Sequence, residues 1–144
     1  MPDAFIGVDV IVGTRGETEE YFEDAYRFIA GLDVTQLHVF SYSERPGTQA
    51  LKIDHVVAPE EKHKRSQRLL TLSDEKTQAF YVRHIGQTMP VLMEKTKAGM
   101  PMHGFTANYI RVEVENDPSL DNKMVDVLLG ELNEDGTALK GTIL

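Results

Sequence analysis

Two short segments combine residue types that could bind an anion or a nucleic acid. Residues 13–17 (GTRGE) follow an apolar run and precede an amphipathic one, and backbone amides in such a place can face an anion or a cofactor. They match neither a P-loop nor a dinucleotide fingerprint, and a purely structural turn is the alternative. Residues 104–112 (GFTANYIRV) interleave aromatic and cationic side chains, the types that stack on and hold single-stranded nucleic acid. The alternative is that these aromatic side chains form a core.

A third candidate is the basic run at residues 62–68 (KHKRSQR). Lys64 and Arg68 are four residues apart and share a helix face, and Arg65 lies beside Arg68. Such a face could grip a phosphate backbone, or it could simply be solvated.

Isolated polar residues indicate little further chemistry. Asp9 interrupts an apolar strand, so it is either a polar residue inside a barrel near an active site or a hydrogen-bonded structural aspartate. His38 lies in an apolar strand, which favours a satisfied core histidine. The other histidines lack metal-ligand spacing, so no metal site is predicted. No Ser-His-Asp arrangement is visible, and no catalytic residue is assigned.

Composition limits the function classes. The 144 residues allow one or two small domains, and no apolar run approaches the length of a membrane helix, so no membrane partner is expected. The chain has no cysteine, which removes disulfides and thiolate metal sites and fits a cytoplasmic location. The net charge of −8 argues against general phosphate binding, and only residues 59–82 carry more basic than acidic residues. Any phosphate contact is therefore expected to be local.

The first half of the chain predicts a strand–helix–strand unit. Residues 5–12 are apolar at nearly every position, which is typical of a strand buried on both faces in a parallel sheet. Thr18 is a suitable N-cap for a helix, and Gly31 could end that helix in a left-handed conformation. Residues 36–42 form a second strand, parallel to the first.

The second half predicts a long helix followed by a small β-structure. Pro59 fits the first position of a helix that could run to about His84. Short strand-like runs separated by turn residues then predict a small antiparallel barrel or sandwich; they are residues 88–94, 107–115, 123–132 and 138–144. In this interpretation one strand face carries Phe105, Ala107, Tyr109 and Arg111. The predicted fold class is α/β plus all-β.

Three segments in order carry a family resemblance. They are residues 7–29 (GVDVIVGTRGETEEYFEDAYRFI), 37–50 (LHVFSYSERPGTQA) and 104–115 (GFTANYIRVEVE). Together they resemble the C-terminal half of radical S-adenosylmethionine methylthiotransferases, from about Ile6 to Leu144. The last segment favours the branch that acts on N6-threonylcarbamoyladenosine in tRNA.

The resemblance implies a fragment of a longer enzyme. Residues 1–58 would be the end of the radical barrel, 59–84 a connecting helix, and 85–144 a TRAM-type RNA-binding β-barrel. The parent enzyme would hold 4Fe-4S clusters and S-adenosylmethionine, and the missing N-terminal part would be a partner. Because such clusters need thiolates and this chain has none, it is expected to bind no cofactor alone and to be inactive alone.

The resemblance also suggests site residues, although the loops depart from the family pattern at Thr14, Arg15 and Glu44. Residues expected at the barrel rim beside the cofactor are Gly13, Gly16, Glu17, Tyr42, Ser43 and Arg45. Residues expected to contact tRNA are Lys64, Arg65, Arg68, Phe105, Asn108, Tyr109 and Arg111. Two alternatives remain: a stand-alone tRNA-binding module, and a protein-interaction fragment without RNA affinity.

Overall fold

The computed structural model describes residues 3–144, which form two compact units. One unit is Ile6–Lys76, and the other joins the residues up to Phe5 with Thr77–Leu144. The boundary falls inside the long helix α2 (Pro59–Val82), which begins at the predicted proline. Within the described residues, neither helix has the length and hydropathy to cross a membrane.

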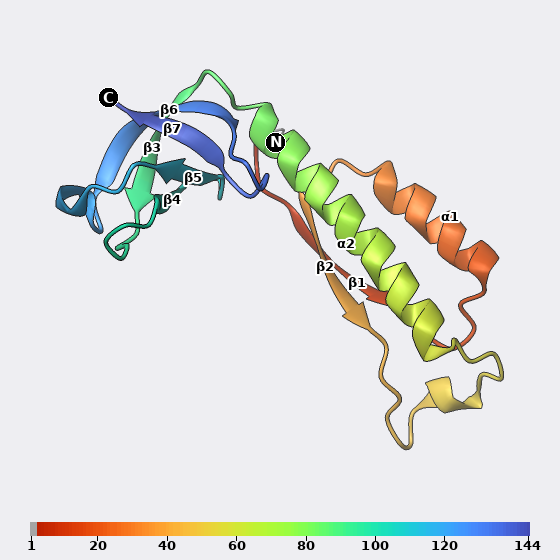
Figure 1. The fold of residues 1–144 in the computed structure, drawn as a ribbon. Coiled ribbons are helices and arrows are strands. Elements are labelled where there is room, and N and C mark those ends of the chain that lie inside the picture. Colours follow the sequence, from red (N-terminus) through yellow and green to blue (C-terminus); the bar gives the residue numbers. More distant parts are fainter. Residues whose placement is uncertain (1–2) are drawn as a thin grey trace. The chain divides into compact units, whose positions relative to one another are not determined.

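The first unit is a parallel strand pair with two helices (Figure 1). Strands β1 (Gly7–Val12) and β2 (Gln36–Ser41) pair in parallel and are joined by helix α1 (Glu19–Ala30). A short 3₁₀ turn, η1 (Gln49–Lys52), follows β2 before α2 begins. The predicted strand–helix–strand unit is confirmed.

Only one face of this sheet is covered. Its core joins Val12, Phe22 and Leu37 to Leu69 and Leu72 of α2. The opposite face is open, with Ile11 59% exposed and Phe40 54% exposed. The prediction of a strand buried on both faces is therefore wrong for this structure, because both helices pack on the same side.

The open face also carries the two polar residues singled out in these strands. Asp9 and His38 are partners in the register of β1 and β2, and both are exposed. The interpretation of His38 as a core histidine is wrong, since its side chain points to the face that no helix covers.

Helix α1 is capped from two different sources. The Thr18 side chain accepts a hydrogen bond from the Tyr21 amide at 3.2 Å, which confirms the predicted N-cap. Gly31 has φ −81° and ψ −10°, so the predicted left-handed ending is wrong. Instead, Lys76 donates to the carbonyl of Ala30 at 3.2 Å and to that of Leu32 at 2.7 Å. A cation at a helix C-terminus satisfies these carbonyls and complements the helix dipole.

One buried serine closes the outer edge of β2. Ser73 of α2 accepts a hydrogen bond from the Leu37 amide at 2.9 Å and donates to the Leu37 carbonyl at 3.2 Å. Both residues are buried. The serine thus satisfies two backbone groups that a neighbouring strand would otherwise pair.

The second unit contains a closed five-stranded barrel in the order β3-β4-β5-β7-β6. Its strands are β3 (Thr88–Met93), β4 (Met102–Thr106), β5 (Arg111–Val114), β6 (Met124–Leu132) and β7 (Leu139–Ile143), with a 3₁₀ turn η2 (Pro118–Leu120). The core is mainly aliphatic and includes Val91, Met93, Met102, Val112 and Leu139. The predicted small barrel is confirmed. It is not wholly antiparallel, because β7 closes it by pairing in parallel with β5.

Residues 107–110 are not part of a strand. They connect β4 and β5, which form an antiparallel hairpin in which Phe105 pairs with Arg111. The prediction that Phe105, Ala107, Tyr109 and Arg111 share one face of a single strand is therefore wrong. The apolar spacing there reflects a hairpin turn and not a continuous alternation.

Candidate functional sites

A hollow of about 400 Å³ lies where β2 ends and its following loop begins. It is lined by Ile11, Phe40, Ser41, Tyr42, Ser43, Arg45, Thr48 and Ala50. Three predicted rim residues, Tyr42, Ser43 and Arg45, are thus brought together. Carboxyl ends of parallel strands are where α/β sheets build ligand sites.

The chemistry of this hollow is mixed. Ile11 and Phe40 give it an apolar wall, and Arg45 is exposed at its rim. The Tyr42 hydroxyl is buried and has no hydrogen-bond partner among the described residues. Lys62 donates to the Tyr42 carbonyl at 3.3 Å and lies 5.5 Å from its ring centroid. An apolar wall with a guanidinium and an unsatisfied hydroxyl suits a ligand that is partly flat and apolar and partly anionic.

The loop at residues 13–17 is held by its own glutamate. The Glu17 carboxylate accepts from the Gly13 amide at 3.0 Å and from Arg65 at 3.0 Å. Arg65 also donates to the Glu17 carbonyl at 2.8 Å and to Glu61 at 3.3 Å. The Gly16 amide donates to the His55 carbonyl at 2.8 Å. The Gly13 and Gly16 amides thus already have acceptors, which favours the structural turn over an open anion nest.

This arrangement changes the expected roles of two residues. Arg65 is only 4% exposed, and its guanidinium is occupied by two carboxylates. It therefore acts as an internal clamp and presents no surface to RNA. Glu17 uses its carboxylate inside the loop, so Gly13, Gly16 and Glu17 could meet a cofactor only through the shape of the turn.

Glycine is required at the start of this turn by a close contact. Gly13 has φ +80°, and an added Cβ would lie 2.4 Å from Cγ of Lys62. The turn therefore packs directly on the stem of the lysine that binds the Tyr42 carbonyl.

Arg15 connects this turn to the loop after β2. Its Nε donates to Glu44 at 2.7 Å, and its Nη1 donates to the carbonyls of Leu51 at 3.1 Å and Ile53 at 3.0 Å. The hydrogen bond from Arg15 lowers the pKa of the Glu44 carboxyl, and the same bond raises the pKa of Arg15. Two positions that depart from the family pattern thus contact each other.

The two other basic residues predicted to contact RNA, Lys64 and Arg68 of α2, differ in whether an acidic residue of the described chain already pairs with them. Arg68 pairs with Glu23 and lies 4.5 Å from the Tyr26 ring centroid. The Arg68 hydrogen bond lowers the pKa of Glu23. Lys64 is exposed. Lys64 is thus better placed than Arg68 to reach a phosphate, because Arg68 would first have to release its carboxylate.

The β4–β5 turn holds an exposed tyrosine in an unusual backbone conformation. Tyr109 has φ +63° and is 66% exposed. The Thr106 hydroxyl accepts from the Ile110 amide at 3.0 Å and donates to Asn108 at 2.6 Å. A left-handed residue other than glycine persists when the surrounding hydrogen bonds determine the turn, and such strain often marks a functional position.

A buried histidine anchors this turn. The Asn108 side chain donates to the Asp3 carbonyl at 2.9 Å and lies 3.3 Å from Nε2 of His84. Nδ1 of His84 is 2.8 Å from the Phe80 carbonyl, so it must carry the proton. In neutral His84, Nε2 is then the acceptor for Asn108. Asn108 thus links the turn that carries Tyr109 to Asp3 and His84, and its contact with RNA stays a prediction.

The surroundings of Tyr109 are aromatic and basic. Its ring centroid lies 6.0 Å from that of Phe5, which packs edge-on against Phe80 at 5.8 Å. Phe105 and Arg111 are half-buried and lie opposite each other on β4 and β5. Among the four predicted contacts on the barrel, Tyr109 is the most exposed.

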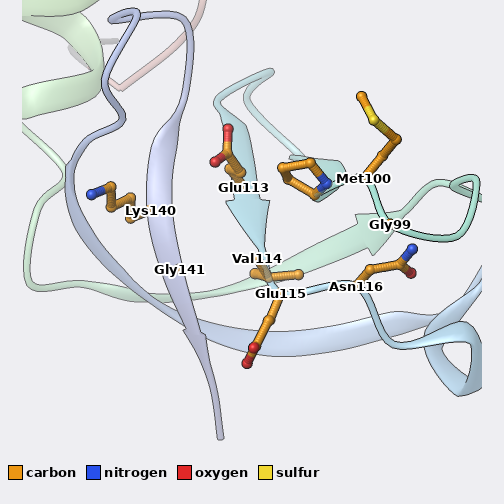
Figure 2. Close-up of a pocket in the computed structure, with 9 residues that line it drawn as sticks. Gly99, Met100, Glu113, Val114, Glu115, Asn116, Lys140 and Gly141 are labelled. Carbon is orange, nitrogen blue, oxygen red and sulfur yellow. The ribbon is translucent and has the colours of Figure 1, made fainter.

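A second hollow of about 620 Å³ lies elsewhere on the barrel, between the loop around Met100 and the neighbouring strands β5 and β7 (Figure 2). Figure 2 shows Glu113 and Glu115 on one segment with their carboxylates pointing in opposite directions. Hydrogen bonds from Asn133 and from His103 lower the pKa of Glu113. The lining holds two carboxylates and one basic residue, Lys140, so this hollow does not resemble a phosphate site.

Comparison with known proteins shows what the chain is similar to. No protein-family model matches the chain. A threonylcarbamoyladenosine tRNA methylthiotransferase of Bacillus subtilis is 33% identical over 131 residues, covering 88% of this chain and 29% of that protein. A similar enzyme of Aquifex aeolicus is 33% identical and covers 89% of this chain and 30% of its own length. A tRNA-2-methylthio-N(6)-dimethylallyladenosine synthase of Aliarcobacter butzleri is 32% identical over 147 residues, 100% of this chain and 33% of that protein.

The chain is homologous to tRNA methylthiotransferases. The family resemblance stated from the sequence is confirmed, and the chain spans about a third of the length of these relatives. Their names divide between two modified adenosines at nearly equal identity, so the comparison does not separate the two branches.

Sequence reasoning missed several residues of this methylthiotransferase homologue. In the sequence, Lys62 is only one member of a basic run. In the structure, the aliphatic part of its side chain packs on Gly13, and this contact fixes where the lysine lies. His84 and Thr106 belong to no sequence motif. Their roles are visible only from their contacts with the β4–β5 turn. The sequence signal that could have indicated this turn is Asn108, a typical turn residue, directly before the aromatic Tyr109.

Proposed function

We propose that this chain is the C-terminal part of a tRNA methylthiotransferase that adds a methylthio group to N6-threonylcarbamoyladenosine. Residues 1–58 would form the last part of a radical barrel, and residues 85–144 a TRAM-type barrel that binds tRNA. The homology over most of the chain supports this proposal. So does the open face of β1 and β2, where exposed Ile11 and Phe40 lie among the polar Asp9 and His38, a mixture that suits a barrel interior beside a ligand site.

The hollow beside Tyr42 fits a part of S-adenosylmethionine. Its apolar wall at Phe40 suits an adenine ring, and Arg45 suits a carboxylate. When bound, S-adenosylmethionine supplies the radical chemistry of the parent enzyme. The chain has no cysteine, so the thiolate ligands of the 4Fe-4S clusters would lie outside it.

The observation that carries the RNA part of the proposal is the strained turn around Tyr109. A ring that is 66% exposed and fixed by buried hydrogen bonds offers a preformed stacking surface. Arg111 on the adjoining strand would meet phosphate or a base edge. Lys64 and Arg68 of α2 would add cationic contacts, as expected from the sequence.

A titration of fluorescein-labelled tRNA with the full chain tests this proposal. Anisotropy measured at several salt concentrations should show binding that weakens steeply as salt rises, because phosphate contacts release counterions. Arg111→Ala should weaken binding and flatten the salt dependence. Arg27→Ala is the matched control, since Arg27 pairs with Asp24 on the exposed face of α1. Absence of tRNA binding at low salt would contradict the RNA-binding role.

One observation favours a second function, binding to a protein. The barrel hollow in Figure 2 is lined by the apolar Met100 and Pro101, by Glu113 and Glu115, and by one basic residue, Lys140, and its excess of carboxylates suits a lysine or arginine side chain of a partner. A chain with this function alone would bind no tRNA at any salt concentration, so the same titration separates the two candidates.

A further inference from the structure

We infer that Arg15 is a positioning residue that fixes the wall of the ligand hollow beside Tyr42. The hollow is lined on one side by Arg45, Thr48 and Ala50, which belong to the loop at residues 44–53. This inference deepens the proposed function and rests on it for the identity of the ligand.

The loop at residues 44–53 has few internal hydrogen bonds. Its backbone hydrogen bonds are local: the amides of Thr48, Leu51 and Ile53 donate to the carbonyls of Arg45, Thr48 and Ala50 at 3.4, 3.4 and 3.1 Å, and the Thr48 hydroxyl donates to the Arg45 carbonyl at 2.8 Å. Residues 44–49 are all exposed. A segment with so little burial has few hydrophobic contacts to hold it in one conformation.

Arg15 forms hydrogen bonds with both ends of this loop. Its Nε binds Glu44 at the start, and its Nη1 binds the carbonyls of Leu51 and Ile53 at the end. The side chain is only 19% exposed, compared with 41% for Glu44. A planar guanidinium can donate in these directions at once, whereas an ammonium cannot.

The position of Arg15 itself is fixed by its neighbours on the turn. The Gly16 amide binds the His55 carbonyl just beyond the loop, at 2.8 Å. The next residue, Glu17, forms an ion pair with the buried Arg65. Arg15 therefore projects from a rigid turn onto a loop that has few internal constraints, so the turn sets where Arg45 lies.

The experiment is amide hydrogen exchange of the full chain, read by mass spectrometry over residues 44–53. Arg15→Ala should speed exchange in this loop roughly tenfold or more, the factor expected for losing hydrogen bonds from a charged donor. Arg15→Lys should speed it nearly as much, because the fork is lost while the charge remains. Glu44→Gln should affect mainly the start of the loop. Arg27→Ala, which removes an equally charged side chain from an exposed pair, should leave the loop unchanged.

The second measurement is calorimetric titration of S-adenosylmethionine into the same variants. If the wild type binds it, Arg15→Ala should weaken binding at least several-fold although Arg15 does not line the hollow, and Arg27→Ala should not. Unchanged loop exchange in Arg15→Ala, with an intact fold by circular dichroism, would overturn the inference. Faster loop exchange with wild-type affinity would also overturn it. No binding by the wild type would count against the cofactor role, while the exchange data would still decide whether Arg15 fixes the loop.

Discussion

Replacing Tyr109 by glycine separates the strain in the β4–β5 turn from the function proposed for its ring. A non-glycine residue in the left-handed region costs about 1–2 kcal/mol, and Tyr109 has φ +63°. Glycine removes that cost, but it also removes the edge contact with Phe5 at 6.0 Å, which is worth about 0.5–1.5 kcal/mol. The two terms nearly cancel, so the free energy of unfolding should change by less than about 1 kcal/mol.

The loss of the ring should nevertheless reduce RNA affinity. Stacking of one base on an aromatic side chain contributes about 1–3 kcal/mol, which corresponds to a roughly 5- to 150-fold increase in the Kd for tRNA. Tyr109→Phe keeps the ring and should bind nearly as the wild type. Tyr109→Ala loses the ring and keeps the strain, so it should bind as weakly as Tyr109→Gly but unfold about 1 kcal/mol more easily.

The assay combines urea denaturation with the anisotropy titration at one fixed salt concentration. Asn122→Gly is the matched control, because Asn122 also has a positive φ, of 58°, and carries no aromatic ring. It should leave tRNA affinity unchanged. Equal stability of Tyr109→Ala and Tyr109→Gly would refute the strain argument, and wild-type affinity of a folded Tyr109→Gly would refute the stacking argument.

Two further outcomes follow from buried and half-buried polar groups. Ser73→Ala should lower the free energy of unfolding of its unit by about 2 kcal/mol, because it leaves the Leu37 amide and carbonyl without partners. Urea denaturation followed by circular dichroism measures this. Ser66→Ala, which removes one exposed hydrogen bond to the Ser41 hydroxyl, is the control and should cost less. Glu113 has a pKa lowered by Asn133 and His103, so its stabilising contribution is present above the ordinary carboxyl pKa and is lost as pH falls through the lowered value. The barrel of Glu113→Gln should therefore lose less stability than the wild type between neutral and strongly acidic pH, and equal losses would show that this carboxylate does not contribute.

Local signals in the sequence predicted the elements well, because their causes are local. Thr18 caps α1 and Pro59 begins α2 as expected, since each acts within one helical turn. The same reasoning failed at Gly31, where Lys76 supplies the C-terminal cap from 45 positions along the chain. It also failed for residues 107–110, because a hairpin turn and a strand carry similar apolar spacing until the partner strand is known.

The sequence by itself determined that the chain contains a strand–helix–strand unit, a long helix and a small barrel, and which family it resembles. Only the tertiary structure decided which of the candidate side chains are available. It paired Arg15 with Glu44 and buried Arg65 between Glu17 and Glu61. It left Tyr109 exposed on a strained turn. The physical reason is that the partners which decide these positions can lie far along the chain, 29 positions for Arg15 and Glu44 and 48 for Arg65 and Glu17, and such separations become contacts only when the chain is packed.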